Sequence, residues 1–242
     1  MAELKAIDKK DEFGELVTTE SFRTFQVMIS ILEKFRKEGR FACVVGPAGS
    51  GKTSSLLFWM ARLGDIYLRH RSTWKKTAFL RALAKAIGIE SPPKYAAACV
   101  EVIEAKLLPA NKLIYVDEAD KLGMDIIEAL RDITDVTYCP IILAGEPVLA
   151  QMMRRNQRIW SRTAFEIVMK PLSVADIISY NNKNHGLDMT QEIAANLHNV
   201  TAGNFRDLRR MMILIEDQCR ASGTKKVETK MIAIAKNTTP RA

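Results

Sequence analysis

Residues 46–53 read GPAGSGKT, and this stretch restricts the possible folds more than any other in the chain. It follows the apolar run 41–45 and precedes the largely apolar segment 56–60, an order that predicts a strand, a tight turn and a helix. The stretch matches G-x-x-x-x-G-K-[ST], a loop whose backbone N–H groups surround phosphate oxygens. The sequence therefore predicts an α/β fold of the P-loop NTPase type, with helices flanking a parallel sheet.

Each position of this loop has a mechanical task. The glycines permit positive φ angles and let backbone N–H groups curl around phosphates in front of a helix N-terminus. Lys52 is expected to reach the β- and γ-phosphates of ATP, and the Thr53 hydroxyl to ligate Mg²⁺. An ordinary glycine turn that happens to contain a lysine is the alternative, disfavoured by the flanking strand and helix. The residues expected to bind the nucleotide are Gly46, Pro47, Ala48, Gly49, Ser50, Gly51, Lys52 and Thr53.

A second motif, LIYVDEAD at 113–120, places paired carboxylates at the end of a buried strand. Ligands bind at that edge of open α/β sheets. Asp117 is expected to hold Mg²⁺ together with Thr53, and Glu118 to orient and deprotonate the attacking water. An Asp-Glu pair after a strand is weak evidence when it stands alone. Because it follows a phosphate loop here, we predict that the chain hydrolyses ATP and does not merely bind it.

Short apolar strands alternate with amphipathic helices as far as residue 171 and predict a parallel sheet with right-handed crossovers. The expected strands lie near 41–45, 66–69, 113–117, 140–144 and 165–169, and the expected helices near 19–37, 74–87, 94–107, 120–134 and 147–155. The remainder is helical, with segments near 173–183, 189–199, 204–219 and 226–235. We therefore expect an N-terminal extension (1–18), an α/β nucleotide-binding core (19–171) and a small helical subdomain (172–242).

Composition excludes several classes of protein. The N-terminus is charged, and no uncharged apolar run approaches the roughly 18 residues that a membrane span requires. Four scattered cysteines without a C-x-x-C pair read as reduced core residues, and the three histidines lack the spacing of a metal site. We expect a cytoplasmic protein with no membrane partner.

Basic residues are concentrated in particular segments of a chain whose net charge is +8. Between residues 66 and 89 there is no acidic residue, and aromatic side chains are interleaved with the basic ones Arg69, Arg71, Lys75, Lys76, Arg81 and Lys85. Such a segment attracts polyanions, although a solvated helix face is the common alternative. We predict contacts of Arg71, Lys75 and Lys76 with DNA phosphates. A second basic block, opposed only by Glu166, contains Arg154, Arg155, Arg158, Arg162 and Lys170.

The motifs together resemble those of AAA+ ATPases. Besides the phosphate loop and the Asp-Glu pair, the chain has an apolar strand with a polar tip (IILAGEP, 141–147), an arginine before the last strand (Arg162) and a G-N-x-R sequence (203–206) in its helical part. The LVTTESF segment (16–22) and the overall spacing are similar to the transposition ATPases of the phage Mu B, TnsC and TniB kind. This resemblance extends over residues 14–236.

The resemblance implies roles for further residues. Arg206 is similar to the sensor arginine that touches the γ-phosphate from the helical lid. Arg162 resembles the finger arginine that reaches the ATP of a neighbouring subunit, with a surface salt bridge as the alternative and Arg158 as the rival for the role. Glu146 stands where relatives usually carry Asn or Gln, so its role is open.

The function implied is that of a largely sequence-nonspecific DNA-binding ATPase. ATP would assemble copies of the chain into a ring or helical filament on duplex DNA, with ATP between subunits, and mark a target for a transposase. Mu B has a separate helix-turn-helix domain, whereas about eighteen residues precede the first expected helix here, so DNA contacts are expected from the AAA+ body.

Alternatives of other classes stay open. One is an ATPase of the same architecture that acts on protein partners in secretion or signalling, and another is a loader for a replicative helicase. A helicase of the class with the D-E-A-D signature needs a second nucleotide-binding domain, for which this chain is too short. A small-molecule kinase needs no trailing helical subdomain.

Overall fold

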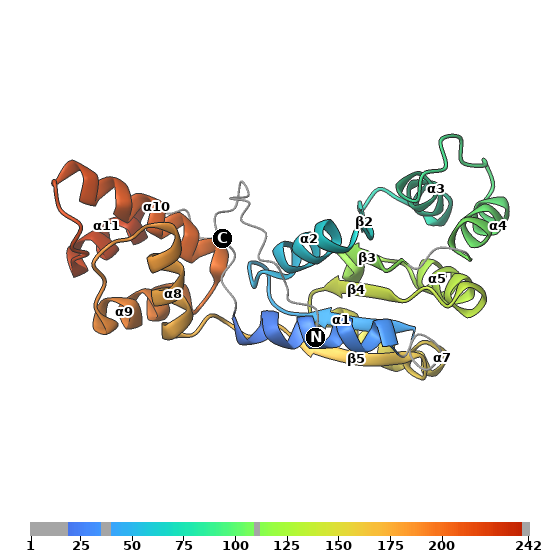
Figure 1. The fold of residues 1–242 in the computed structure, drawn as a ribbon, viewed down its shortest axis with the longest axis horizontal. Coiled ribbons are helices and arrows are strands. Elements are labelled where there is room, and N and C mark those ends of the chain that lie inside the picture. The colour runs from blue at the N-terminus through green and yellow to red at the C-terminus, as the bar shows by residue number, and fades with distance from the viewer. Residues whose placement is uncertain (1–18, 35–39, 109–111, 239–242) are drawn as a thin grey trace. The chain divides into compact units, whose positions relative to one another are not determined.

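A computed structural model describes residues 19–34, 40–108 and 112–238. The chain divides into two compact units, one of Ser21–Lys170 and one that includes Pro171–Ala242 (Figure 1). The first unit holds the sheet and the second is helical. The N-terminal extension expected at 1–18 lies outside the described residues.

The sheet has five parallel strands in the order β2-β3-β4-β1-β5. The predicted parallel sheet is confirmed, and β1 and β4 lie at its centre, where their burial on both faces favours near-continuous apolar sequence. The strands are β1 (Phe41–Val45), β2 (Ile66–Arg69), β3 (Ile114–Asp117), β4 (Ile141–Gly145) and β5 (Thr163–Val168).

Helices cover both faces of the sheet. Alternate strand side chains, including Cys43, Val116 and Leu143, belong to one core with the apolar faces of five helices. Their neighbours along the strands are largely buried and point to the opposite face, which α2 contacts. Helix α1 packs on α2 through Phe22, whose ring lies against Phe58 and Trp59. The helices of this unit are α1 (Glu20–Lys34), α2 (Lys52–Leu63), α3 (Lys76–Ala86), α4 (Ala96–Leu107), α5 (Met124–Thr137), α6 (Val148–Arg155) and α7 (Gln157–Trp160).

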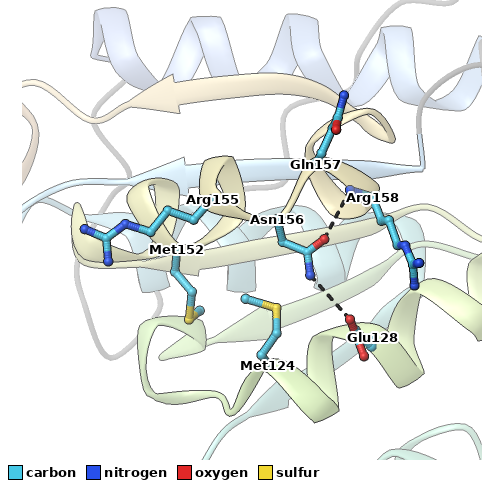
Figure 2. A pocket seen from close by; sticks show the side chains of 7 residues that line it. All are labelled: Met124, Glu128, Met152, Arg155, Asn156, Gln157 and Arg158. Carbon is cyan, nitrogen blue, oxygen red and sulfur yellow. Dashed lines mark hydrogen bonds between the residues drawn. The ribbon is translucent and has the colours of Figure 1, made fainter.

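Two short elements were not expected from the sequence. A single 3₁₀ turn, η1 (Ala119–Lys121), follows β3, so α5 begins at Met124 and not near residue 120. The delay has a local cause, because Leu122 and Gly123 adopt extended backbone conformations, with ψ angles of 138° and 149°, that an α-helix cannot contain. The other element is α7, a single turn in which the Asn156 side chain accepts a hydrogen bond from the Arg158 N–H (Figure 2).

The helical unit consists of four helices at the expected positions. They are α8 (Val174–Asn184), α9 (Gln191–Thr201), α10 (Phe205–Ala221) and α11 (Thr229–Thr238). A capping box of Ser173 and Asp176 fixes the start of α8, and Thr190 and Asn204 cap the next two helices. Apolar faces from all four helices meet in a separate core.

All four cysteines are buried, as expected for core residues. No helix in the described part of the chain has the length and apolar character needed to cross a membrane.

We predict that Leu83→Ala destabilises the α/β unit by about 2–5 kcal/mol, because the side chain is fully buried in α3 within the core shared with α4 and α5. Urea denaturation measures the change. Lys85→Ala, on the exposed side of the same helix, is the control and should stay within about 0.5 kcal/mol of wild type. Equal stability of the two variants would contradict the packing described here.

Candidate active site

The carboxyl ends of three neighbouring strands bring the predicted motifs together. β1 pairs with β4, and β4 pairs with β3, all in parallel. The loop after β1 is therefore adjacent to the tip of β4, and the Gly46 N–H donates to the Gly145 carbonyl at 3.3 Å. One edge of the sheet thus carries the phosphate loop, the Asp-Glu pair and the polar tip of β4.

The phosphate loop is curled as its sequence predicts. Gly49 and Gly51 have φ angles of 80° and 91°, a region that side chains disfavour. The Lys52 ammonium, on the first residue of α2, donates to the carbonyls of Gly46 and Pro47 at 2.7 and 3.0 Å. Burial lowers the pKa of Lys52, and Asp117 is the foremost of the nearby carboxylates that oppose the shift. The cation is therefore held over the loop in which phosphates are expected.

Thr53 and Asp117 meet as the sequence predicts. The Thr53 hydroxyl donates to Asp117 Oδ2 at 2.8 Å, and the Tyr67 hydroxyl donates to the same oxygen at 2.9 Å. The carboxylate is only 2% exposed. Two hard oxygen donors in contact suit Mg²⁺, which binds few protein ligands and completes its shell with phosphates and water. The described residues contain no cluster of three or more His, Cys, Asp or Glu side chains suited to a metal.

Sequence reasoning missed Tyr67 as part of this site. Its pKa is raised by burial and by Asp117, so the phenol stays protonated and keeps donating its hydrogen bond. The sequence shows that Tyr67 is a residue with a hydroxyl group in an expected strand. It does not show that this strand lies beside β3, and only that pairing brings the hydroxyl to Asp117.

Glu118 is held by two cations. Arg69 Nη2 lies 2.7 Å from one carboxylate oxygen, and Lys121 Nζ lies 2.5 Å from the other. The hydrogen bond from Lys121 lowers the pKa of Glu118, burial opposes this, and the bond from Arg69 lowers it further. A carboxylate with both oxygens engaged is a poor general base. The two ion pairs thus restrain Glu118, the residue predicted to activate water. The sequence did not indicate that Arg69 and Lys121 bind Glu118.

The tip of β4 is fastened to η1. The Glu146 N–H donates to Asp120 Oδ1 at 3.1 Å, and a Cβ at Gly145 would collide with the same aspartate. Only glycine therefore permits this approach. The Glu146 side chain is exposed and close enough to Lys52 to act on its pKa, and the function of Glu146 stays open.

Arg162 lies near the amino-terminal ends of the strands, whereas the phosphate loop follows the carboxyl end of β1. Its Nε donates to Asp135 Oδ1 at 2.9 Å and its Nη1 to the Arg158 carbonyl at 3.0 Å. Asp135 also accepts from Arg40. The next residue, Thr163, pairs with Phe41 at the start of β1, so one strand length, about 16 Å at 3.3 Å per residue, separates Arg162 from the loop after β1. Arg162 therefore does not belong to the nucleotide site of its own chain.

The remaining predicted residues belong to other segments of the chain. Arg206 is exposed in the first turn of α10, in the helical unit, and its role as a sensor stays a prediction. Arg71 and Lys75 are exposed after β2, and Lys76 is half-buried at the start of α3. The Arg71 guanidinium lies 5.5 Å from the centre of the Trp74 ring.

Residues 35–153, which span the phosphate loop, the Asp-Glu pair and the tip of β4, match the model of a family described as an AAA domain. The chain carries an AAA ATPase domain.

Curated relatives of this AAA domain protein are similar at low identity. A potential ATP-binding protein of Staphylococcus aureus is 28% identical over 52% of this chain and 49% of its own length. The Mu-like prophage FluMu DNA transposition protein B of Haemophilus influenzae is 25% identical over 72% of this chain and 63% of its own length. The ATP-dependent target DNA activator B of Escherichia phage D108 is 26% identical over 63% and 53%, so the matches span about half to under two-thirds of these relatives.

Solved structures confirm the fold. The Aeropyrum pernix ORC2 protein, crystallised as ADPNP-ADP complexes, has a TM-score of 0.67 at 11% identity over 97% of this chain and 73% of its own. The Aeropyrum pernix ORC1 protein in complex with DNA has a TM-score of 0.67 at 16% identity over 94% and 67%. At these identities the likeness concerns the architecture, a P-loop sheet with flanking helices and a helical C-terminal part.

Lys52→Ala is expected to lower ATP affinity at least about tenfold, because the ammonium over the loop is a charge-assisted donor for phosphates. Titration with a fluorescent ATP analogue measures the effect. Lys112→Ala, at the other end of the sheet, is a control that should bind like wild type. Undiminished affinity of Lys52→Ala would remove the loop from nucleotide binding.

Arg69→Ala is expected to raise the steady-state rate of ATP hydrolysis up to about fivefold, the equivalent of losing an exposed ion pair worth about 1 kcal/mol. The reason is that one Glu118 oxygen becomes available to water. Arg69→Lys, which keeps the charge, should stay near the wild-type rate, and Glu118→Gln should bind ATP but hydrolyse it slowly. A lower rate in Arg69→Ala would show that Arg69 assists the chemistry and does not restrain it.

Proposed function

We propose that this AAA ATPase binds duplex DNA with little sequence preference, oligomerises on it when ATP is bound, and regulates transposition by selecting a target or activating a transposase. The observation that carries the proposal is the direct connection between the basic segment 71–76 and the restrained glutamate. Arg69 ends β2 and holds Glu118, and two residues later the chain enters the exposed basic segment.

Exposed positive charges in this segment lie beside a side chain that packs on the core. Trp74 packs on the core of the α/β unit and makes an edge contact with buried His70. Arg71 lies over the same indole, and Lys75 is exposed beside it. A phosphate backbone that binds Arg71 and Lys75 therefore comes within two residues of Arg69 and competes with Glu118 for its guanidinium group. DNA binding would in this way release Glu118 and stimulate hydrolysis.

The residues at the carboxyl ends of the strands have different roles in the proposed hydrolysis of ATP. Lys52 and the loop N–H groups bind the phosphates, while Thr53 and Asp117 would hold Mg²⁺, which supplies charge neutralisation at the phosphates when bound. Glu118, once released, accepts a proton from the water that attacks the γ-phosphorus, and ADP leaves. Arg206 would approach the γ-phosphate from the helical unit and report which nucleotide is bound.

We expect oligomers with ATP between subunits. Arg162 lies near the start of β1, at the end of the strands opposite to the phosphate loop, and this position favours contact with the nucleotide of another copy. Assembly would therefore depend on ATP and be cooperative. The names of two relatives, a DNA transposition protein and a target DNA activator, support a transposase as the downstream partner.

Replacing Lys75 and Lys76 together by Ala is expected to weaken DNA binding and to reduce the slope of log affinity against log salt by about one unit for each lost phosphate contact. Fluorescence anisotropy with a random duplex, in ATP and at several salt concentrations, measures both quantities. The control is Lys183→Ala with Lys236→Ala, two exposed lysines of the helical unit.

A wild-type affinity and slope in the variant would place the DNA surface elsewhere. If the wild-type chain binds no duplex in ATP, ADP or neither, the function moves to an ATPase that acts on protein partners, and the basic segment becomes a candidate docking site for them.

A further inference from the structure

The acidic side chains at the carboxyl ends of β3 and β4 differ in how their charge is compensated. Asp117 accepts hydrogen bonds from two hydroxyl groups, and Glu118 is held by two cations. Asp120 accepts a hydrogen bond from the Glu146 N–H at 3.1 Å. The Glu146 carboxylate is exposed and forms no ion pair within the described part of the chain. Its negative charge is therefore free to act on a bound ligand.

A short series of contacts places Glu146 beside the phosphate loop. The residue before it, Gly145, ends β4 next to the end of β1, and the Gly145 carbonyl accepts from the Gly46 N–H at 3.3 Å. The Gly46 carbonyl in turn accepts from the Lys52 ammonium at 2.7 Å. Among the carboxylates that oppose the lowering of the Lys52 pKa by burial, Glu146 is second only to Asp117. Glu146 therefore acts on the place where the β- and γ-phosphates are expected.

Lys52 does not neutralise Glu146 through direct contact. Its Nζ donates to the carbonyls of Gly46 and Pro47 at 2.7 and 3.0 Å and lies 3.5 Å from the Ser50 hydroxyl oxygen. An ammonium group has three hydrogens to donate, and the loop offers an acceptor for each of them. The positive charge of Lys52 and the negative charge of Glu146 thus interact through space, and both are available to phosphates.

The backbone of Glu146 is fixed on both sides of the residue. Its N–H is bonded to Asp120, and its carbonyl accepts from the Leu149 N–H at 2.9 Å. The next residue, Pro147, has its φ angle fixed by the ring and leads directly into α6. The Glu146 carboxylate can therefore change position only by rotation about the bonds of its own side chain.

The partner of the Glu146 backbone indicates which phosphate the carboxylate affects most. Asp120 belongs to η1, the turn that directly follows Glu118. Glu118 is predicted to activate the attacking water, and this water must reach the γ-phosphorus, so the γ-phosphate is expected on the side of η1. ADP has no phosphate at that place. A negative charge held there therefore affects ATP more than ADP.

We infer that Glu146 determines nucleotide selectivity: its carboxylate repels the γ-phosphate and lowers the affinity for ATP relative to the affinity for ADP. Lys52 and the N–H groups of the loop attract the phosphates of either nucleotide, whereas Glu146 opposes chiefly the last phosphate of ATP. Departure of that phosphate after hydrolysis relieves the repulsion. This selectivity is a property of the single chain and requires neither DNA nor assembly.

The test compares the affinities of dilute protein for ADPNP, an ATP analogue that resists hydrolysis, and for ADP, both with Mg²⁺. Glu146→Gln removes the charge and keeps the size of an exposed side chain, so folding should be unaffected. We expect ADPNP affinity to rise about fivefold and ADP affinity to change less than about twofold, as for one repulsion between exposed charges. Isothermal titration calorimetry measures both affinities, and the gain should shrink at high salt, which screens exposed charges.

Two further variants separate the effect of the charge from effects of shape and of total charge. Glu146→Asp keeps a carboxylate on the same backbone and should stay closer to wild type than to Glu146→Gln. Glu101→Gln removes an equal charge from an exposed glutamate of α4, in the same unit of the chain, and should bind both nucleotides like wild type.

An unchanged ratio of ADPNP to ADP affinity in Glu146→Gln, in protein with a wild-type melting curve, would overturn the inference. A lower ADPNP affinity would also overturn it, because Glu146 would then assist nucleotide binding. A reduced kcat at unchanged affinity would instead place Glu146 among the residues that orient water. None of these outcomes bears on DNA binding, and a wild-type chain that binds no duplex would leave the nucleotide selectivity of Glu146 in force.

Discussion

All five strands of the sheet run parallel, and the rest of the site depends on this constraint. Parallel strands place every carboxyl end at one edge, so segments far apart in the chain, the phosphate loop after β1, the carboxylates after β3 and the tip of β4, become neighbours. The hydrogen bond from Thr53 to Asp117 then joins the first helix after the loop to the middle of the sheet. A chain with the same motifs on an antiparallel sheet would scatter them over two edges.

The parallel arrangement also places the residues between α6 and β5 near the amino-terminal ends of the strands. Connections between parallel strands must return along the sheet, so α6 carries the chain from the tip of β4 back to the start of β5. The arginines after α6 are thus separated from the phosphates by the length of a strand. One topology therefore places the phosphate loop and Arg162 at opposite ends of the strands.

The sequence predicted those parts of the site that are formed by residues close together in the chain. The phosphate loop, Asp117 and the parallel sheet follow from contiguous patterns; the structure confirms the sheet and places Thr53 in contact with Asp117, while their roles in binding stay predictions. The restraint of Glu118 by Arg69 could not be predicted in this way, because it requires β2 to lie beside β3 in a register that opposes Arg69 to Asp117. Strand order is a property of the assembled core, and no single segment encodes it. The left-handed backbone of Glu118 also escaped prediction.

The interactions of Asp117 and Glu118 differ in their exposure to solvent, and therefore in the free energy needed to break them. Asp117 is buried and accepts from two hydroxyls and from the Glu118 N–H, and breaking such bonds would leave polar groups unsatisfied in the core. The pair of Arg69 and Glu118 is different, since the Arg69 side chain is 60% exposed and an ion pair of this kind contributes only about 0–1 kcal/mol. A phosphate backbone that competes for Arg69 or moves the residues after it can therefore break the pair at small cost. Because Asp117 and Glu118 are consecutive residues, in the proposed function a small shift at the end of β2 would free the Glu118 carboxylate while Asp117 stays bonded to Thr53.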